Sequence, residues 1–246
     1  MILTSVVPSA ADAERIDLDD DGALQSLAAL YAPPRAEWLR LNLVSSVNGS
    51  AAGGDGTSDS LTNRADRTIL RAIRSLADVV LVGAASVRAE GYHVPRSSRL
   101  AVLTGTGDLD GHRVRSDIEP GRLLVICPAG AVAQVEASLD GAAAAEIIVV
   151  DDVGGRVAPA DVIARLRGRG LAHIVCEGGP SLAGQLLDAE IVDELCLSTG
   201  PVITTAQLPL FGSTGVVERR LELSQLLVDD RSGLYARWLV PRPAAV

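Results

Sequence analysis

The sequence is short of several residue types, and each shortage narrows the class of protein. Lysine is absent, and all 22 basic residues among the 246 are arginine, a bias typical of GC-rich coding sequences. The 31 acidic residues give a formal net charge of −9. A nucleic-acid partner is therefore not expected, because binding to a phosphate backbone depends on a basic surface.

Cysteine is scarce, and long apolar runs are missing. Cys127, Cys176 and Cys196 are odd in number, widely spaced and set in apolar segments, which predicts buried thiols and neither a disulfide framework nor a metal cluster. No apolar run approaches the roughly 18 residues of a membrane-spanning helix, and residues 1–12 lack the basic start of a signal peptide. These absences predict a cytoplasmic protein without a membrane partner.

Three common catalytic signatures are also missing. The sequence contains no H-E-x-x-H, C-x-x-C or G-x-S-x-G motif, and His93, His112 and His173 are scattered along it. Metal-hydrolase and serine-hydrolase functions are therefore disfavoured, and we expect no metal.

What remains is the composition of a folded protein, with 48% hydrophobic and 22% charged residues. Residues 1–36 differ from the rest. An acidic run over residues 17–21 precedes a helical pattern over residues 23–31, with Asp20 or Asp21 as the expected N-cap and Pro33 and Pro34 ending the pattern. We expect an N-terminal arm over residues 1–36, packed on one main domain over residues 37–246.

From Trp38 onward, short apolar segments alternate with helical patterns. This alternation predicts an α/β fold with a mostly parallel sheet and helices on both faces. We expect strands at 39–44, 79–82, 100–103, 123–127, 147–150, 174–176, 194–198, 223–228 and 236–240, and helices at 64–76, 131–139, 160–169 and 182–189. The turn-rich residues 229–233 predict that the last two strands pair antiparallel.

Ligands of an open α/β sheet bind at the carboxyl ends of its strands, so the segments that follow the strands are candidate sites. Residues 45–58 and 82–92 are rich in small residues that let the backbone approach an anion. Residues 174–182 end a strand at Glu177 and continue through a Gly-Gly-Pro-Ser turn, in which Ser181 could cap the next helix. This turn is similar to a pyrophosphate-binding turn, although a flexible loop or a structural turn remains the alternative for each segment.

Charged residues supplement these segments. Arg96 and Arg99 precede one strand, and Arg71 and Arg74 lie on the helix before another, where guanidinium groups could clamp a phosphate or stay solvated. A carboxylate at a strand end, such as Glu177, needs a polar partner, and a substrate would provide one.

Several motifs in one order resemble the reductase domain of the bacterial riboflavin-biosynthesis deaminase-reductase, over about residues 38–240, and most closely its stand-alone actinobacterial members. The resemblance is carried by residues 46–49, 56–58, 76–83, 86–88, 177–182 and 192–197 before Pro201. It implies a dihydrofolate-reductase-like α/β fold, a homodimer, and NADPH-dependent reduction of a ribosylamino-pyrimidine 5′-phosphate. The zinc signature of the deaminase half is absent, so we expect neither zinc nor deamination.

The resemblance also implies roles for individual residues. Glu177 and Asn48 occupy the catalytic positions, Arg74 and Arg96 would hold the 5′-phosphate, and Ser86 with Glu90 would orient the nicotinamide. The cofactor contacts fall on Val44, Ser60, Ser86, Glu90, Thr104, Gly105, Gly178, Gly179, Pro180, Ser181 and Leu182, and the substrate contacts fall on Ser58, Arg74, Val94, Arg96 and Glu177.

Two departures from the family pattern leave alternatives open. Asn48 stands where the family commonly has Asp, and Ser60 stands where it has an aromatic residue. Water or Glu177 would then supply the proton. One alternative is an NADPH-dependent reductase of a pteridine or dihydrofolate-like substrate, whose pocket would be acidic at the substrate end. The other is a catalytically silent NADPH-binding dimer.

Overall fold

The computed structural model describes residues 1–7, 15–114, 118–139, 145–154, 156–212 and 218–241. Within these residues the main sheet contains β1 (Ile2–Val7), β2 (Arg15–Asp17), β3 (Trp38–Ser46), β4 (Val79–Gly83), β5 (Arg99–Leu103), β6 (Leu123–Pro128), β7 (Ala145–Val150), β10 (His173–Cys176), β11 (Glu194–Gly200), β12 (Glu222–Asp229) and β13 (Leu234–Leu239). A small separate hairpin is formed by β8 (Asp152–Val153) and β9 (Arg156–Val157).

The helices are α1 (Ala23–Leu30), α2 (Arg64–Ser75), α3 (Ala84–Glu90), α4 (Val132–Ser138), α5 (Pro159–Arg167) and α6 (Pro180–Asp188), with short 3-10 turns η1 (Asp59–Leu61) and η2 (Ala129–Ala131). Each helix that the sequence predicts is present, within a few residues of its expected bounds. Among the described residues, no helix has the length and apolar character that crossing a bilayer requires.

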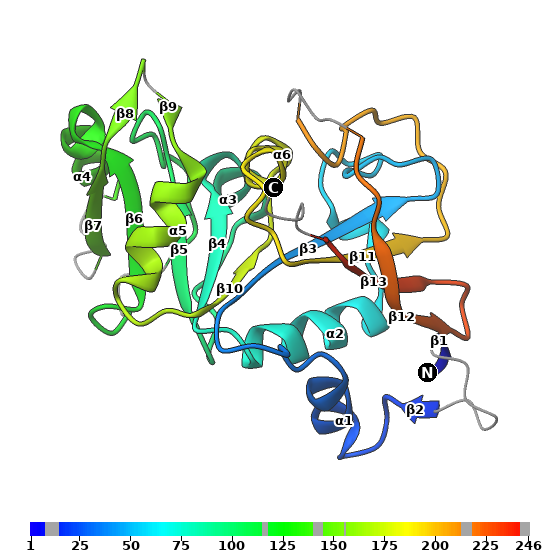
Figure 1. Ribbon diagram of the computed structural model, residues 1–246. Helices are drawn as coiled ribbons and strands as arrows, with labels where there is room; N and C mark the ends of the chain where they lie inside the picture. Colours follow the sequence, from blue (N-terminus) through cyan, green and yellow to red (C-terminus); the bar gives the residue numbers. More distant parts are fainter. Residues whose placement is uncertain (8–14, 115–117, 140–144, 155, 213–217, 242–246) are drawn as a thin grey trace.

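The main sheet has the strand order β2-β1-β12-β13-β11-β3-β10-β4-β5-β6-β7 (Figure 1). All neighbours from β11 to β7 pair parallel, whereas β13 pairs antiparallel with both β11 and β12. The predicted mostly parallel sheet with antiparallel strands at its C-terminal end is therefore confirmed.

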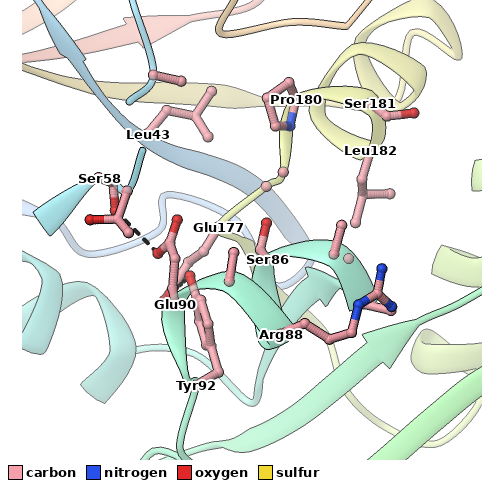
Figure 2. A pocket seen from close by; sticks show the side chains of 18 of the residues that line it. Leu43, Ser58, Ser86, Arg88, Glu90, Tyr92, Glu177, Pro180, Ser181 and Leu182 are labelled. Carbon is pink, nitrogen blue, oxygen red and sulfur yellow. Dashed lines mark hydrogen bonds between the residues drawn. The ribbon is translucent and has the colours of Figure 1, made fainter. Parts of the chain in front are cut away.

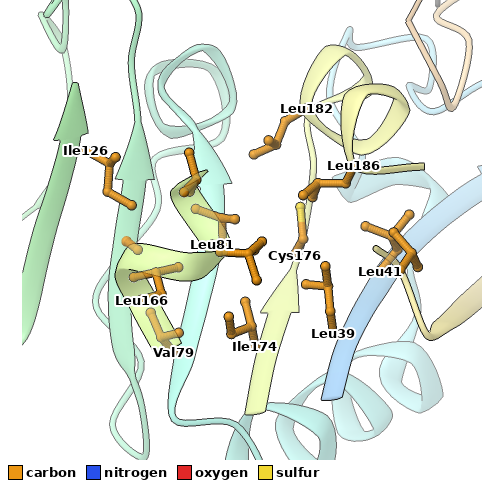
Figure 3. Packing of buried hydrophobic residues seen from close by; sticks show 14 of the residues in the cluster. Leu39, Leu41, Val79, Leu81, Ile126, Leu166, Ile174, Cys176, Leu182 and Leu186 are labelled. Atoms are coloured by element: carbon orange, nitrogen blue, oxygen red, sulfur yellow. The ribbon is translucent and has the colours of Figure 1, made fainter. Parts of the chain in front are cut away.

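Both faces of the parallel part are covered, because successive residues of a strand point to opposite sides. Val79 and Leu81 of β4 pack with α5 and α6, while Val80 and Val82 pack with α3 and α4. Figure 3 shows the first of these layers, in which side chains of α5 and α6 meet those of β3, β4 and β10. Helices α1 and α2 pack on the same side of the sheet as α3, over the part of the sheet that contains β1, β10, β11, β12 and β13. The expectation of helices on both faces is confirmed.

The N-terminal residues add two strands to the edge of this sheet. β1 pairs with β12, more than 200 residues further along the chain, and β2 pairs with β1. Such a distant pairing leaves no local pattern, so the sequence did not predict either strand. The division into an arm of residues 1–36 and a domain of residues 37–246 stays a prediction.

The structure overturns one local expectation, the N-cap of α1, and confirms another, the burial of the cysteines. The N-cap of α1 is Gly22 without a side-chain hydrogen bond, so the prediction of Asp20 or Asp21 as N-cap is wrong. The chain enters α1 through a turn in which Ala23 N donates to the Asp20 carbonyl oxygen, and this turn supplies a backbone partner instead. The three cysteines are free and buried, as predicted.

Candidate functional site

A cavity of about 1440 Å³ lies where β3, β4, β5 and β10 end. Helices α2, α3 and α6 and the loops near residues 51–62 and 208–210 complete its wall. Its volume exceeds the roughly 300–1,000 Å³ of a pocket for one small molecule, so it has room for a large cofactor beside a second ligand. The position agrees with the general rule that open α/β sheets bind ligands at the carboxyl ends of their strands.

Most of the residues singled out in the sequence meet in this cavity. Its wall includes Val44, Ser58, Arg74, Ser86, Glu90, Thr104, Gly105, Glu177, Gly178, Gly179, Pro180, Ser181 and Leu182. Arg71 and Arg99, two of the candidate phosphate clamps, are not part of the wall, and neither are four residues to which the family resemblance assigns a role: Asn48, Ser60, Val94 and Arg96.

Asn48 makes contacts that hold two loops together. Its Nδ2 donates to the carbonyl oxygen of Thr204 at 2.9 Å, and its Oδ1 accepts from Ser46 Oγ and from Thr204 N. Val47 N also donates to the Val202 carbonyl oxygen, so the loop after β3 is fixed to the loop after β11. The amide of Asn48 is therefore occupied within the protein.

Ser60, Val94 and Arg96, the other three residues with implied roles that lie outside the wall, have different surroundings. Ser60 Oγ donates to Asp55 Oδ1 within its own loop. Val94 packs against the hydrophobic cluster around β4, β5 and β6. The Arg96 side chain is exposed, and its backbone carbonyl oxygen accepts from Arg122.

Two glycine-containing turns meet at the centre of the cavity wall. Gly83 N, at the end of β4, donates to the Gly178 carbonyl oxygen at 2.8 Å. A Cβ on Gly83 would lie 3.6 Å from Gly179 N, and one on Gly179 would lie 2.8 Å from Ser86 Oγ. Gly178 has φ +92°, a conformation that favours glycine, and its peptide bond to Gly179 is cis. Bare backbone therefore forms this part of the wall.

Helix α6 begins at this turn without a capping side chain. Its N-cap is Gly179, and Ser181 Oγ accepts a hydrogen bond from Gln185 Nε2, so the expectation that Ser181 caps the helix is wrong. The first backbone amides of a helix have no partner inside the helix, and its dipole is positive at that end. The turn can therefore bind an anionic group through its backbone.

The polar partner of Glu177 comes from the protein. Arg74 Nε donates to Oε1 at 2.7 Å and Arg74 Nη2 donates to Oε2 at 2.6 Å, a two-bond pair that joins the end of α2 to the end of β10. Tyr92 OH also donates to Oε2, at 3.0 Å. Burial lowers the pKa of Arg74, but the hydrogen bond and the charge of Glu177 outweigh it, and the resulting pKa is raised.

A second contact links the loop before α2 to helix α3. Ser58 Oγ donates to Glu90 Oε2 at 3.1 Å, and Figure 2 shows this pair beside Tyr92 and Glu177. Burial raises the pKa of Glu90, as do the charges of Glu177 and Asp59, while the bond from Ser58 lowers it. Glu90 thus keeps its proton to a higher pH than an exposed carboxyl.

The sequence assigned no role to several residues of the wall, among them Tyr92, Asp66 and Arg113. Asp66 lies in the first turn of α2 and is buried, and this burial is the main cause of its raised pKa. Arg113 is exposed and packs against Gly91, and it has no ion-pair partner in the part of the chain that the structure describes. A carboxylate three residues after the N-cap Asn63 was the one signal available for Asp66.

Two ion pairs join charged residues of the wall, Arg67 with Asp59 and Arg74 with Glu177. Arg67 Nη2 lies 2.8 Å from Asp59 Oδ1, and Arg88 donates to the carbonyl oxygen of Asp108. Among the described residues, no group of three or more His, Cys, Asp or Glu is placed to hold a metal ion. The arrangement can bind an anion through backbone amides and a polar molecule through carboxyl groups.

Comparison with known proteins shows which family the sequence and the fold are similar to. The sequence matches the RibD C-terminal domain over residues 37–233. No protein with a curated description matches it. A pyrimidine reductase-like protein from Corynebacterium diphtheriae is 26% identical, with a TM-score of 0.76, and the match covers 89% of this chain and 99% of that chain.

Two more distant structures share the fold. The deaminase/5-amino-6-(5-phosphoribosylamino)uracil reductase from Thermotoga maritima is 19% identical, with a TM-score of 0.66, and the match covers 84% of this chain and 57% of that chain. The riboflavin biosynthesis reductase Rib7 from Saccharomyces cerevisiae is 14% identical, with a TM-score of 0.60, covering 89% and 97%. The fold, the cavity at the strand ends and the extent of the sequence match agree, and the chain belongs to the RibD C-terminal domain family.

Proposed function

We propose that the protein reduces a ribosylamino-pyrimidine 5′-phosphate with NADPH, a reaction of the 5-amino-6-(5-phosphoribosylamino)uracil reductase type in riboflavin biosynthesis. The observation that carries this proposal is the large cavity at the strand ends, with its bare glycine turns, in a member of the RibD C-terminal domain family. The homodimer that the family resemblance implies and the cytoplasmic location that the sequence predicts both stay predictions.

The residues of the cavity fit a dinucleotide. Gly83, Gly178 and Gly179 contribute backbone without side chains to the wall, and the first amides of α6 could bind a pyrophosphate. Ser86, Thr104 and Gly105 line the same wall and can accept or donate hydrogen bonds to the ribose and amide groups. When bound, the reduced nicotinamide supplies a hydride for the ribose carbon C1, and one proton is taken up from water overall.

The protein contributes positioning at the substrate side. Glu177 is held by Arg74 and Tyr92, so its orientation is fixed before the substrate arrives. We assign Arg74 to this positioning role, because both of its bonds to Glu177 would break if it turned to a phosphate. Arg113, exposed and without an ion-pair partner in the described residues, is the better placed cation for the 5′-phosphate.

The test of the proposal is NADPH oxidation by the purified chain, followed by the loss of NADPH absorbance. The phosphoribosylamino-pyrimidine and dihydrofolate are supplied in parallel reactions. Turnover of the pyrimidine supports the proposal. Turnover of dihydrofolate alone, or NADPH binding with no turnover of either compound, would overturn it in favour of one of the two alternatives.

The phosphate site is tested by comparing two arginines. Arg113→Ala should raise KM about tenfold for the phosphorylated substrate and little for its dephosphorylated analogue, because a charge-assisted contact is lost. Arg96→Ala is the matched control, since that side chain is exposed outside the cavity wall. If Arg96→Ala shows the selective effect and Arg113→Ala does not, the phosphate site lies at Arg96, as the family resemblance implies.

One observation favours a second candidate, the reduction of a pteridine-type ring. The carboxyls Asp59, Asp66, Glu90 and Glu177 gather in the wall, while Arg67 and Arg74 are paired with two of them. A pocket of this kind is suited to a ring rich in N–H donors.

A further inference from the structure

One part of the cavity wall is a long connection outside the named helices and strands. Residues 201–212, which we call the strap, follow β11 and reach the first turn of α6 (Figure 1, in orange). The strap contributes Leu208 and Leu210 to the wall. At its far end, Gly212 N donates to the Pro180 carbonyl oxygen at 2.8 Å. The strap is therefore attached to the turn whose backbone can bind an anionic group.

The loop after β3 holds the strap in place. Ala51 N donates to the Leu208 carbonyl oxygen at 2.7 Å, and Leu208 N donates to Ser50 Oγ at 3.3 Å. Among the described residues, the only side chains outside the strap that hydrogen-bond to it are those of Ser50 and Asn48. Ser50 is buried, whereas Asn48 is exposed. Asn48 is thus the side-chain fastening that can be altered without opening the core.

The amide of Asn48 binds both backbone polar groups of one strap residue. Its Oδ1 accepts from Thr204 N at 3.2 Å, and its Nδ2 donates to the Thr204 carbonyl oxygen at 2.9 Å. Ser46 Oγ donates to the same Oδ1 and accepts from Ser50 N, which fixes the direction of the amide. A carboxylate only accepts, so an Asp would place a negative charge against the Thr204 carbonyl oxygen. The contact requires an amide at position 48.

We propose that Asn48 is a positioning residue for the cofactor, because its amide keeps the strap against the cavity beside the first turn of α6. A strap released from Asn48 leaves the wall without Leu208 and Leu210 for part of the time. A site that is formed for only a fraction of the time binds its ligand more weakly by that fraction. This inference rests on the proposed NADPH-dependent function, and it gives the departure at position 48 a role other than proton transfer.

The first test measures NADPH binding by Asn48→Ala and Asn48→Asp. Each loses the bond to the Thr204 carbonyl oxygen, and fluorescence titration should show an affinity about tenfold weaker, mostly through faster dissociation. Val47→Ala is the matched control, because that side chain is 61% exposed and its bond to the strap is made by the backbone. The control should bind NADPH as the unmodified chain does. Unchanged affinity in either Asn48 variant would overturn the proposal.

Steady-state kinetics separate positioning from catalysis. If position 48 supplied a proton, the carboxyl of Asn48→Asp would raise kcat and leave the KM for NADPH unchanged. The positioning role predicts that the KM for NADPH rises about tenfold, while kcat at saturating NADPH changes less than about threefold, because excess cofactor keeps the site formed. A changed kcat with an unchanged KM overturns the proposal.

Hydrogen exchange in the free chain tests the strap without cofactor or substrate. The amides of Leu208 and Gly212 keep their own hydrogen-bond partners in Asn48→Ala, so faster exchange there would report opening of the whole strap. We expect about tenfold faster exchange at both amides, with unchanged protection in β4 and β10. Equal exchange of the strap in the two chains, or faster exchange in β4 and β10 as well, would overturn the proposal.

Failure of this inference can be told apart from failure of the proposed function. If the unmodified chain neither binds nor oxidises NADPH, the function fails, and the assignment of Asn48 to the cofactor fails with it. If the unmodified chain oxidises NADPH with the phosphoribosylamino-pyrimidine and the Asn48 variants bind NADPH equally well, the function stands and the inference alone fails.

Discussion

The surroundings of Glu177 could be predicted from the sequence only in part. A carboxylate at the end of an apolar strand needs a polar partner, and a substrate was the expected one. The structure supplies Arg74 and Tyr92 instead, and the guanidinium group of Arg74 donates a hydrogen bond to each of the two carboxylate oxygens. Glu177 therefore approaches a substrate with its direction already fixed.

Arg74→Ala should destabilise the protein by about 3 kcal/mol, because it leaves the Glu177 side chain, 5% exposed, as a buried charge without its cation. Urea unfolding measures the change in the free energy of unfolding. Arg71→Ala is the control on the same helix: Arg71 is exposed, and we expect a change within about 0.5 kcal/mol. Equal changes in the two variants would show that the pair with Glu177 contributes little.

At the scale of elements, the two turns after β4 and β10 shape the site together. A hydrogen bond from Gly83 to Gly178 holds them in contact, and Ser86 lies where a side chain on Gly179 would have to go. The glycines were visible in the sequence, but their mutual contact was not, because the two turns are nearly 100 residues apart.

Gly179→Val should weaken NADPH binding about tenfold or more, since the added side chain meets Ser86 Oγ and fills part of the bare turn. Fluorescence titration with NADPH measures the affinity. Gly54→Val is the control, because a Cβ at Gly54 would meet no atom within 4 Å. Unchanged affinity in Gly179→Val would show that the turn is structural only.

Helix α2 is tied at its start to the hairpin of β12 and β13. Asn63 Nδ2 donates to Asp229 Oδ2 at 2.7 Å, and Tyr235 OH donates to the same oxygen at 2.7 Å. Burial raises the pKa of Asp229, but hydrogen bonds from Tyr235, Gly233, Arg231 and Asn63 outweigh it and hold that pKa below its ordinary value of 3.8. The ionised carboxylate is thus favoured in the folded state.

Asp229→Asn should make stability less sensitive to acid. A carboxyl whose pKa is lowered by folding stabilises the protein above its unfolded pKa, and this contribution is lost as the pH falls through the lowered folded pKa. The unmodified chain should therefore lose stability from about pH 4 downward more steeply than the variant. Thermal unfolding across this range measures both slopes, and parallel slopes would contradict the assignment to Asp229.

At the scale of the whole molecule, the N-terminal residues are part of the packed structure. Leu27 and Tyr31 are 0% and 1% exposed, and the backbone oxygens of Leu30 and Tyr31 accept from Arg237 and Arg40. Those two arginines in turn pair with Glu194, which is fully buried.

Removal of residues 1–36 should abolish cooperative thermal unfolding. The deletion exposes one face of the sheet and the edge of β12, and each large apolar side chain lost from the core contributes about 1.5–3 kcal/mol. Several such losses are comparable to the whole stability of a domain, about 5–15 kcal/mol. Circular dichroism follows the transition. Asp21→Ala, an exposed change in the same segment, should leave it unaltered, and a cooperative transition in the shortened chain would show an independent main domain.

The sequence by itself determined the order and type of most elements and the location of the glycine turns. These features depend on periodicity and on conformational preferences within a few residues, which the sequence states directly. The edge strands β1 and β2 were not predicted, because β1 pairs with the distant strand β12 and β2 pairs in turn with β1.

Only the tertiary structure decided which side chains share the cavity. It turned Asn48 toward Thr204, left Arg96 outside the wall, and placed Asp66 and Glu177 in the same wall. Such choices depend on the twist and pairing of strands far apart in the chain, since a side chain's neighbours follow from where whole elements pack. Sequence patterns describe each element alone, and the chemistry of this site arises between elements.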